Sequence, residues 1–465
     1  MSMGSSRAIA AIAAAAWLSG AQPVLAQDVS DEQFGRVHFS TSCNEIAQRR
    51  FDRAMRYQHS FWYRESKGLF EDALAADPEC AIAYWGIALS LLFNPHVPPP
   101  AQNLALGVAP LEKGRALGAK TQRERDYIDA LLAFYTDHER VSHGQRVQAY
   151  LKAMEALAQR YPDDDEAQIG YSIVLNVAAS PNDKTYANQL KGIALLEPIF
   201  KRQPRHPGVA HYLIHLYDYP PLAEKGLDAA RRYAEIAPAA PHAQHMPSHV
   251  FTRVGYWKES IASNEASARA AKAGKESHDQ LHAMDYLVYA HLQLAHDKEA
   301  RAVVDEMIQV KGFNPNVRTG PYAIAASQAR YVLERSDWKG AAALQVQPTQ
   351  FAYVDAVTHF ARALGAAAAL HVGGAVRPLL RPPGDRQVHP PIRGAGLLRL
   401  ALPAPHGPDH LAAPAARLVE GSPRQGGSPP RRGEGSLARQ RLFPVGGRPL
   451  QAKPIESASA QPPAP

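Results

Sequence analysis

Histidine pairs at a regular spacing are the residues of this sequence best suited to chemistry. His211 and His215 form one i, i+4 pair, and His245 and His249 form a second. Residues four apart share one face of a helix, where two imidazoles can bind a single metal ion. Equivalent members of the two pairs are 34 residues apart, which indicates the same position in two successive repeats. All four side chains are therefore predicted to face a common space.

Two interpretations of these histidines remain open. As metal ligands, neutral imidazoles suit Zn²⁺ or Cu²⁺ better than Ca²⁺ or Mg²⁺, with Asp218 and His242 as substitute ligands. Affinity should then fall below about pH 6.5, because a protonated imidazole cannot ligate. As structural residues, the same histidines would form hydrogen bonds that shape a groove or join adjacent helices. The chain has no HExxH motif that would place a catalytic glutamate between them.

The surrounding segments have the period of helices. After a loop over residues 94–103, the pattern predicts a helix over 104–118 and then two helix pairs, namely 121–138 with 143–160 and 164–178 with 187–203. Thr121 and Glu124 have the spacing of a capping box. No segment alternates with period two for long enough to predict a strand. The expected fold class is all-α.

The positions of small, large and terminating residues resemble those of the tetratricopeptide repeat. Ala73, Pro78, Trp85 and Gly86 fall where that 34-residue repeat places its packing and terminating residues. The phrases HPGVAHYLIHLYD, HAQHMPSHVFTRVGYW, HSFWY and CAIAYWGIALS resemble those of exported bacterial tetratricopeptide-repeat proteins. The resemblance implies a right-handed superhelix of antiparallel helix pairs, an α-solenoid, over residues 27–365.

The resemblance also implies which residues line a concave groove. Aligned on the repeat, the groove positions beyond the histidine pairs hold six further residues: His242, Arg253, His282, Asp285, Tyr289 and Arg330. His59 also falls on a groove position, but it lies several repeats from the main cluster and is not predicted as a ligand. Pro247 falls inside a helix, so it either kinks that helix or marks a late start near Met246.

The function predicted from these observations is recognition without catalysis. An extended repeat surface binds a peptide or protein segment, and the chain has no phosphate loop, no GxSxG elbow and no supported cysteine nucleophile. The alternative is a zinc- or copper-binding protein, or a metal-dependent enzyme, that uses the His211/His215/His245/His249 cluster. Replacing His211 and His245 together should then abolish binding and leave helicity intact.

The first 26 residues have the features of a secretory signal peptide. Arg7 precedes an apolar run, and Val24-Leu25-Ala26 forms a small-residue cleavage site. An uncleaved anchor is the alternative, but the apolar run is short for a membrane span. We therefore expect a periplasmic or secreted protein with no membrane insertion after cleavage. In such a compartment Cys43 and Cys80, the two cysteines of the chain, are predicted to form a disulfide rather than two buried thiols.

The composition changes abruptly after residue 365. Residues 366–465 hold twelve Arg and one Lys against two Asp and three Glu, so they carry about +8 of formal charge. The remainder is close to neutral, which gives no reason to predict a nucleic-acid surface. Frequent prolines predict a disordered tail. It is either a natural extension or the out-of-frame reading of a GC-rich gene, and the break after THFARALGAA favours the second.

Overall fold

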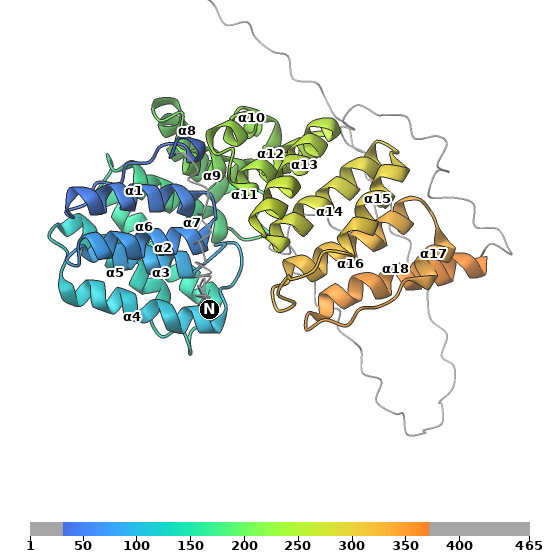
Figure 1. The fold of residues 1–465 in the computed structure, drawn as a ribbon, viewed down its shortest axis with the longest axis horizontal. Helices are drawn as coiled ribbons and strands as arrows, with labels where there is room; N and C mark the ends of the chain where they lie inside the picture. The colour runs from blue at the N-terminus through green and yellow to red at the C-terminus, as the bar shows by residue number, and fades with distance from the viewer. Residues whose placement is uncertain (1–30, 372–465) are drawn as a thin grey trace, which may run out of the picture. The chain divides into compact units, whose positions relative to one another are not determined.

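The computed structural model describes residues 31–371 of the chain, and these residues form helices with no strand (Figure 1). A 3₁₀ turn, η1 (Asp31–Phe34), precedes the first helix. The helices that lead up to the histidine pairs are α1 (Glu45–His59), α2 (Tyr63–Ala76), α3 (Ala81–Leu91), α4 (Ala101–Leu117), α5 (Gln122–Tyr135), α6 (His143–Arg160), α7 (Asp165–Val177) and α8 (Ala187–Arg202). The all-α prediction is confirmed for the described residues.

The remaining helices carry the histidine pairs and the segments after them. They are α9 (Pro207–Tyr217), the 3₁₀ turn η2 (Ala223–Gly226), α10 (Leu227–Ile236), α11 (Pro241–His245), α12 (Pro247–Val254), α13 (Trp257–Gly274), α14 (Ser277–Gln293), α15 (Asp297–Met307), α16 (Thr319–Glu334), α17 (Trp338–Ala343) and α18 (Ala352–His371). Successive helices pack side by side along the chain, as Figure 1 shows for α1 to α3 and for α14 to α16. This arrangement of stacked helix pairs is that of an α-solenoid.

Local sequence signals explain where several helices begin. At the start of α5, the Thr121 hydroxyl accepts the Glu124 N–H at 3.2 Å and the Glu124 carboxylate accepts the Thr121 N–H at 3.3 Å. The predicted capping box is therefore confirmed, and Ser142 and Gln145 form another at the start of α6. The predicted loop over 94–103 ends earlier than expected, since α4 begins at Ala101.

A small residue allows the close packing of α2 on α3, as the repeat pattern predicts. A Cβ atom built on Gly86 would lie 2.4 Å from the ring of Phe70, a distance that no side chain tolerates. Phe70 is fully buried there and stacks edge-on against Phe51 of α1 at 5.0 Å between ring centroids. Gly86 therefore brings the aromatic core of α1, α2 and α3 together.

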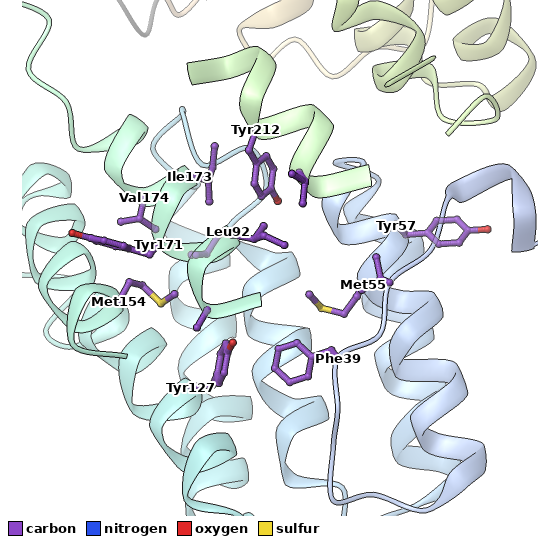
Figure 2. Packing of buried hydrophobic residues seen from close by; sticks show 14 of the residues in the cluster. Phe39, Met55, Tyr57, Leu92, Tyr127, Met154, Tyr171, Ile173, Val174 and Tyr212 are labelled. Carbon is purple, nitrogen blue, oxygen red and sulfur yellow. The ribbon is translucent and has the colours of Figure 1, made fainter. Parts of the chain in front are cut away.

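The apolar interior is divided between two large clusters of buried residues. One extends from Phe34 to Phe251, and Figure 2 shows part of it; the other extends from Leu281 to Ala341. The histidine-bearing helices α11, α12 and α14 lie where the chain passes from one cluster to the other. Within residues 31–371, no helix is both long enough and apolar enough to cross a membrane.

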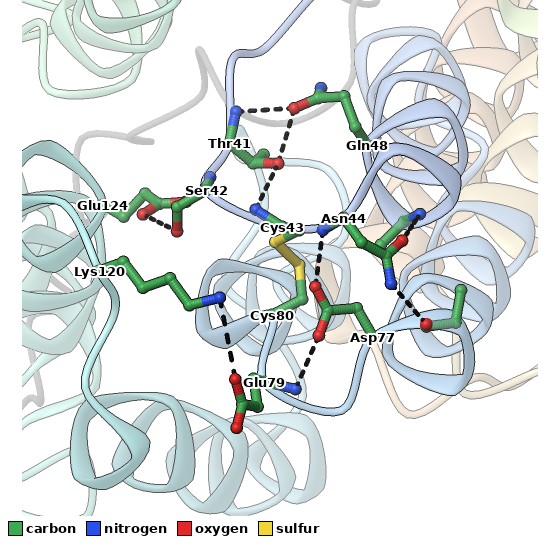
Figure 3. Close-up of a disulfide and its surroundings, with 12 residues drawn as sticks. Thr41, Ser42, Cys43, Asn44, Gln48, Asp77, Glu79, Cys80, Lys120 and Glu124 are labelled. Carbon is green, nitrogen blue, oxygen red and sulfur yellow. Dashed lines mark hydrogen bonds and ion pairs between the residues drawn. A yellow bond between two sulfur atoms is a disulfide. The ribbon is translucent and has the colours of Figure 1, made fainter.

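The structure joins Cys43 and Cys80 in a disulfide with an S–S distance of 2.00 Å (Figure 3). The segment before α1 is held there by side chains as well, because the Glu124 carboxylate accepts the Ser42 N–H at 2.7 Å and Asp77 accepts the Asn44 N–H at 2.7 Å. The bridge thus ties the N-terminal segment to the start of α3.

Replacing Cys43 with Ser is expected to lower the free energy of unfolding by about 4 kcal/mol. The disulfide closes a loop with a sequence separation of 37 residues, and the chain-entropy relation gives that magnitude for a loop of this length. Urea denaturation of the variant and of the parent measures the difference. The parent in reducing buffer should match the variant; an unchanged urea midpoint in either case would contradict the prediction.

Of two further predicted boundaries, one agrees with the helices observed and one differs. Pro247 separates two short helices and occupies the first position of α12, which agrees with the predicted interruption. Helix α18 continues to His371, past residue 365, where the repeat array was predicted to end. The predicted signal peptide and the rest of the predicted tail, residues 372–465, lie outside the described residues.

Candidate metal centre

Four helix segments place six histidines next to one another. Helix α9 carries His211 and His215 one turn apart, and its start is fixed by Pro207 and by the His206 side chain, which accepts the Val209 N–H. Helices α11 and α12 carry His242, His245 and His249, and α14 carries His282. A proline also opens each of the two short helices α11 and α12. Met246, between them, keeps helical dihedral angles (φ −53°, ψ −36°), so His245 and His249 still share one face.

The first histidine group consists of His211, His215 and His242. Its imidazole nitrogens lie within 4.8 Å of one another. The Nε2 atom of His211 is 3.1 Å from the Nε2 atom of His215 and 3.1 Å from that of His242. His211 is fully buried, and the other two rings are partly exposed. Three ring nitrogens therefore converge on one small space.

Hydrogen bonding fixes the tautomer of His211. Its Nδ1 atom lies 2.6 Å from the backbone carbonyl oxygen of His59. A carbonyl oxygen can only accept, so Nδ1 carries the proton and Nε2 of the neutral ring has a lone pair. Burial, followed by the neighbouring histidines, lowers the pKa of His211 to about 3. The same causes hold the pKa of His215 and His242 well below the ordinary value.

The second histidine group consists of His245, His249 and His282. Its nitrogens also lie within 4.8 Å of one another, and the Nε2 atoms of His245 and His249 are 3.0 Å apart. The ring of His282 lies 4.4 Å from that of His245, measured between centroids. Burial and the charges of neighbouring histidines hold the pKa of His245 well below its ordinary value.

In the second group, two nitrogen lone pairs face each other. Asn264 Oδ1 lies 2.7 Å from His245 Nδ1, and the Asn264 amide is oriented by its own donation to the Ser260 carbonyl at 2.8 Å. Asp218 Oδ2 lies 2.8 Å from His249 Nδ1. Both oxygens are acceptors, so each Nδ1 atom donates and each Nε2 atom is unprotonated in the neutral rings. A cation between the two Nε2 atoms would remove the repulsion between their lone pairs.

The nitrogen separations fit a metal ion. Zinc binds imidazole nitrogen at about 2.0–2.1 Å, so nitrogens at two corners of a tetrahedral site lie roughly 3.3 Å apart. The observed separations of 3.0 and 3.1 Å are close to that value. The oxygens that accept from the Nδ1 atoms are the partners that metal-bound histidines commonly have, because they fix the orientation of the ring.

The two histidine groups are neighbours. The ring centroids of His215 and His249 are 6.1 Å apart, and those of His242 and His245 are also 6.1 Å apart. Ring centroids within one group can be as far apart, since those of His215 and His242 are separated by 6.4 Å. The predicted pairs thus come together, but the nitrogens form two sets of three, each completed by a further histidine, in place of one set of four.

Asp218 lies on the far side of the His249 ring from the converging nitrogens. Its second oxygen accepts from the Arg253 Nε atom at 2.8 Å, and both oxygens are therefore engaged. This arrangement suits a residue that orients His249 rather than the predicted substitute ligand. Arg253, predicted in the groove, is half-buried against this carboxylate.

Two of the predicted groove residues are buried against each other. Arg330 of α16 forms an ion pair with Asp285 of α14, and both side chains are almost fully buried. Asp285 also accepts from the Ser327 hydroxyl at 2.8 Å. The guanidinium of Arg330 lies over the ring of Tyr289, 5.2 Å from its centroid. Asp285 and Arg330 join two helices and present no charged surface to a peptide.

Replacing Arg330 with Met is expected to lower the free energy of unfolding by about 3–5 kcal/mol, because it leaves the buried Asp285 carboxylate without its cation. The double variant Arg330→Met with Asp285→Leu should recover most of this loss, since it removes both charges together. Thermal or urea denaturation of the three proteins provides the comparison. If the double variant is no more stable than Arg330→Met, the ion pair does not explain the loss.

A third group of ligand-type residues lies beside the first and was missed by the sequence interpretation. Glu166 Oε2 accepts from His59 Nε2 at 3.1 Å, and Glu166 Oε1 accepts from His206 Nε2 at 2.8 Å. All three side chains are buried. Although burial opposes ionisation, the two histidines hold the pKa of Glu166 well below its ordinary value. The donors and acceptors here satisfy one another, so this group is a hydrogen-bonded connection between α1, α7 and α9.

Residues distant in sequence also contact the first histidine group. The ring of Phe61 lies 4.3 Å from that of His211 and stacks on His242 at 5.0 Å, measured between centroids. The ring of His96, in the loop before α4, lies 4.4 Å from that of His215. The HSFWY phrase was the one available signal for Phe61. Nothing in the spacing of the chain indicates His96.

The comparisons with known proteins do not go beyond the fold. No protein-family model matches the chain, and the search of curated proteins finds no relative. Eleven chains of solved structures match, among them a signal transduction ATPase with numerous domains (STAND) protein with a tetratricopeptide repeat sensor from Pyrococcus horikoshii. That alignment has 13% identity and a TM-score of 0.41, and it covers 70% of this chain. The chain spans about half (49%) of the length of that protein.

Proposed function

We propose that the protein binds two divalent transition-metal ions, one at each histidine group. The observation that carries the proposal is the pair of Nε2 atoms, 3.0 Å apart, on His245 and His249, each on a ring whose Nδ1 atom lies at an acceptor oxygen. Their Nδ1 atoms both donate to these oxygens, and burial lowers the pKa of His245, which disfavours the protonated form of that ring. A metal ion stabilises this arrangement, because it accepts both lone pairs at once.

Zinc and copper are the ions that fit the donor atoms. All six side chains offer imidazole nitrogen, and the ligands that Ca²⁺ and Mg²⁺ prefer are oxygens. Three protein ligands at each site leave a position open for a water molecule or another small ligand. Because the groups are neighbours, one small ligand bridging two ions is compatible with the ring separations of 6.1 Å.

We propose that this protein is exported. The support is the leader-like sequence of residues 1–26 and the Cys43–Cys80 disulfide, since disulfides persist in oxidising compartments. The resemblance of its sequence phrases to those of exported bacterial tetratricopeptide-repeat proteins motivates the same proposal. Cleavage after Ala26 would be checked by N-terminal sequencing of the protein isolated from the periplasm, where Gln27 is the expected first residue.

Zinc titration of metal-free protein without a polyhistidine tag tests the proposal. The expected result is that two equivalents of zinc are retained after desalting, as measured by elemental analysis. The same protein loaded with copper should retain two equivalents of copper. A retained amount below one-tenth of an equivalent would exclude metal binding and leave the six histidines as packing and hydrogen-bonding residues. Calcium offers a comparison and should not be retained.

Protein or peptide binding is a second candidate function. The stacked helix pairs provide an extended surface, and on it His282, Arg253 and Tyr289 remain partly exposed. Phage display of random peptides against the intact protein would select binding sequences. If the selected peptides no longer bind the Tyr289→Ala variant, their binding site is on this surface. If the variant binds them equally well, the site is elsewhere.

A further inference from the structure

A buried tyrosine, Tyr286 of α14, contacts the second histidine group. It follows His282 by four residues, so the two side chains share one face of the helix. The Tyr286 ring stands edge-on to the His245 ring at 4.7 Å between centroids. Its centroid separations from the rings of His249 and His282 are 5.3 and 5.4 Å. The rings of all three histidines of the group therefore lie next to this tyrosine.

The Tyr286 hydroxyl oxygen lies close to one of the converging nitrogens, 3.4 Å from the Nε2 atom of His249. A hydroxyl donates to an oxygen acceptor over about 2.5–3.0 Å, and 3.4 Å is long for a nitrogen acceptor as well. Two ligands at corners of a tetrahedral zinc site lie roughly 3.3 Å apart, which agrees with the observed separation. The oxygen is therefore placed as a further ligand of the same ion would be.

The first histidine group has no equivalent oxygen. Within residues 31–371, no tyrosine hydroxyl is hydrogen-bonded to a ring nitrogen of His211, His215 or His242. The tyrosine nearest to that group, Tyr233, contacts it by ring stacking, since its ring lies 5.0 Å from that of His211 with the two planes 14° apart. The two groups therefore differ: three histidines make up the first, and a tyrosine oxygen adjoins the three histidines of the second.

The surroundings of Tyr286 keep its hydroxyl protonated before a metal binds. Burial, followed by the charge of Asp218, raises the pKa of Tyr286 well above its ordinary value. Asp285 and Tyr322 act in the same direction, and the Arg253 guanidinium opposes them. A divalent cation beside the oxygen reverses this balance, because a metal ion favours the deprotonated form of the groups that bind it.

We propose that Tyr286 is the fourth protein ligand of the second histidine group, a role that rests on the metal binding proposed above. When the ion binds, the O–H bond of Tyr286 breaks, the proton passes to solvent and the oxygen bonds to the ion, with no change in oxidation state. Three nitrogens and one oxygen are a donor set that Zn²⁺ and Cu²⁺ both accept. The second group then supplies a complete tetrahedral site, whereas the first keeps an open position.

Loading the intact protein with Cu²⁺ tests this proposal, because a phenolate bound to Cu²⁺ gives a charge-transfer band in visible light that imidazole ligands do not give. The expected result is such a band with the intensity of one of the two copper ions. Tyr286→Phe keeps the ring and removes only the oxygen. At saturating copper this variant should bind both ions and lack the band, and its affinity for one ion should be at least about tenfold lower.

Tyr135→Phe is the matched control. Tyr135 of α5 is 1% exposed, its hydroxyl donates to the Ala88 carbonyl oxygen at 2.7 Å, and it belongs to neither histidine group. The band and the copper affinity of this variant should be unchanged. Circular dichroism of both variants confirms that the helices remain.

Two histidine variants and a zinc titration complete the test. His242→Gln alters the first group and should keep the full band, whereas His282→Gln alters the second and should lose it. Zinc binding at pH 7 should ionise one tyrosine, as seen in the ultraviolet difference spectrum, and Tyr286→Phe should lack this change.

The outcomes separate this proposal from metal binding itself. The proposal is overturned if the unsubstituted protein holds two copper ions without the band, or if Tyr286→Phe keeps the band. Either result leaves the binding of two ions by the histidines in place. A protein that retains neither copper nor zinc would refute metal binding, and the role of Tyr286 with it.

Discussion

The His242→Gln variant is expected to retain one zinc ion where the unsubstituted protein retains two. His242 belongs to the first histidine group, and its Nε2 atom is 3.1 Å from that of His211. Loss of one of three ligands should lower the affinity of that group roughly 100-fold or more, since even the loss of a supporting hydrogen bond costs 10–100-fold. The second group keeps all three of its nitrogens. His282→Gln should give the complementary result.

The control for both variants is His278→Gln. His278 lies on α14, one turn before His282, and belongs to neither group. Elemental analysis after desalting, together with competition against a chromophoric zinc chelator, gives the stoichiometry and the affinity of each protein. Loss of both ions from either variant would indicate a single shared site, and retention of both ions would mean that the substituted histidine is not a ligand.

Substitutions at the buried histidines are expected to lower stability, contrary to the prediction from the sequence. Residues of a groove were expected to contribute little to helix packing, so that replacing His211 and His245 together would leave the helices intact. In the structure His211 is fully buried and stacks on Tyr233 at 5.0 Å, and His245 is 2% exposed. Removing both rings would leave cavities and lower stability. His242 and His282 are partly exposed and are the better positions to test.

The repeat period predicted which residues share a surface, because that depends only on position within each helix pair. Gly86 against Phe70 and the capping box at Thr121 also follow from local rules. The period did not determine which nitrogens of neighbouring helices converge. That depends on how neighbouring helices pack, since His242 and His211 are 31 residues apart and their Nε2 atoms are 3.1 Å apart.

Contacts between distant segments could not be predicted from the sequence either, because they too depend on how the helices pack. His59 is 152 residues from His211, yet its carbonyl oxygen accepts from the His211 ring because α1 packs against α9. The separation in sequence between His59 and the histidine pairs therefore gave no indication of its contact with His211. Likewise Asp285 and Arg330 occupy groove positions by register, but their opposite charges and the packing of α14 on α16 bring them together.

Acidification of the metal-free protein from pH 7 to 5 is expected to destabilise it strongly. In the unfolded chain a histidine has a pKa of about 6.5, whereas burial lowers the pKa of folded His211 to about 3 and that of His245 well below 6.5. Below about pH 6.5 the unfolded state therefore binds protons that the folded state does not. Stability is present above pH 6.5 and is lost as the pH falls.

The magnitude follows from the linkage relation. Each such histidine lowers the free energy of unfolding by up to about 1.4 kcal/mol per pH unit, so His211, with a folded pKa of about 3, contributes a loss of about 1.5–2 kcal/mol between pH 6.5 and 5. His245 adds to this loss in the same direction. His215 and His242 add a smaller amount, because they are partly exposed and screened by solvent. Asp279 opposes them: burial and Glu276 raise its pKa to about 7, so folding takes up a proton there in the same window.

Urea denaturation at half-unit steps between pH 7.5 and 5, with a chelator present, measures this dependence. The Glu166 carboxylate does not contribute in that range, because its pKa in the folded state lies below the ordinary value and its stabilising effect is lost only at lower pH.

A protein with His215→Gln and His242→Gln together should show a shallower dependence of stability on pH. The His278→Gln variant, on a helix of this centre, again serves as the control. Zinc should oppose the acid effect near pH 6.5, since metal bound to the folded state stabilises it by mass action. A free energy of unfolding that stays constant from pH 7 to 5 would contradict this prediction, because it would show that the buried histidines gain protons without cost. It would also remove the argument that the facing nitrogen lone pairs repel each other.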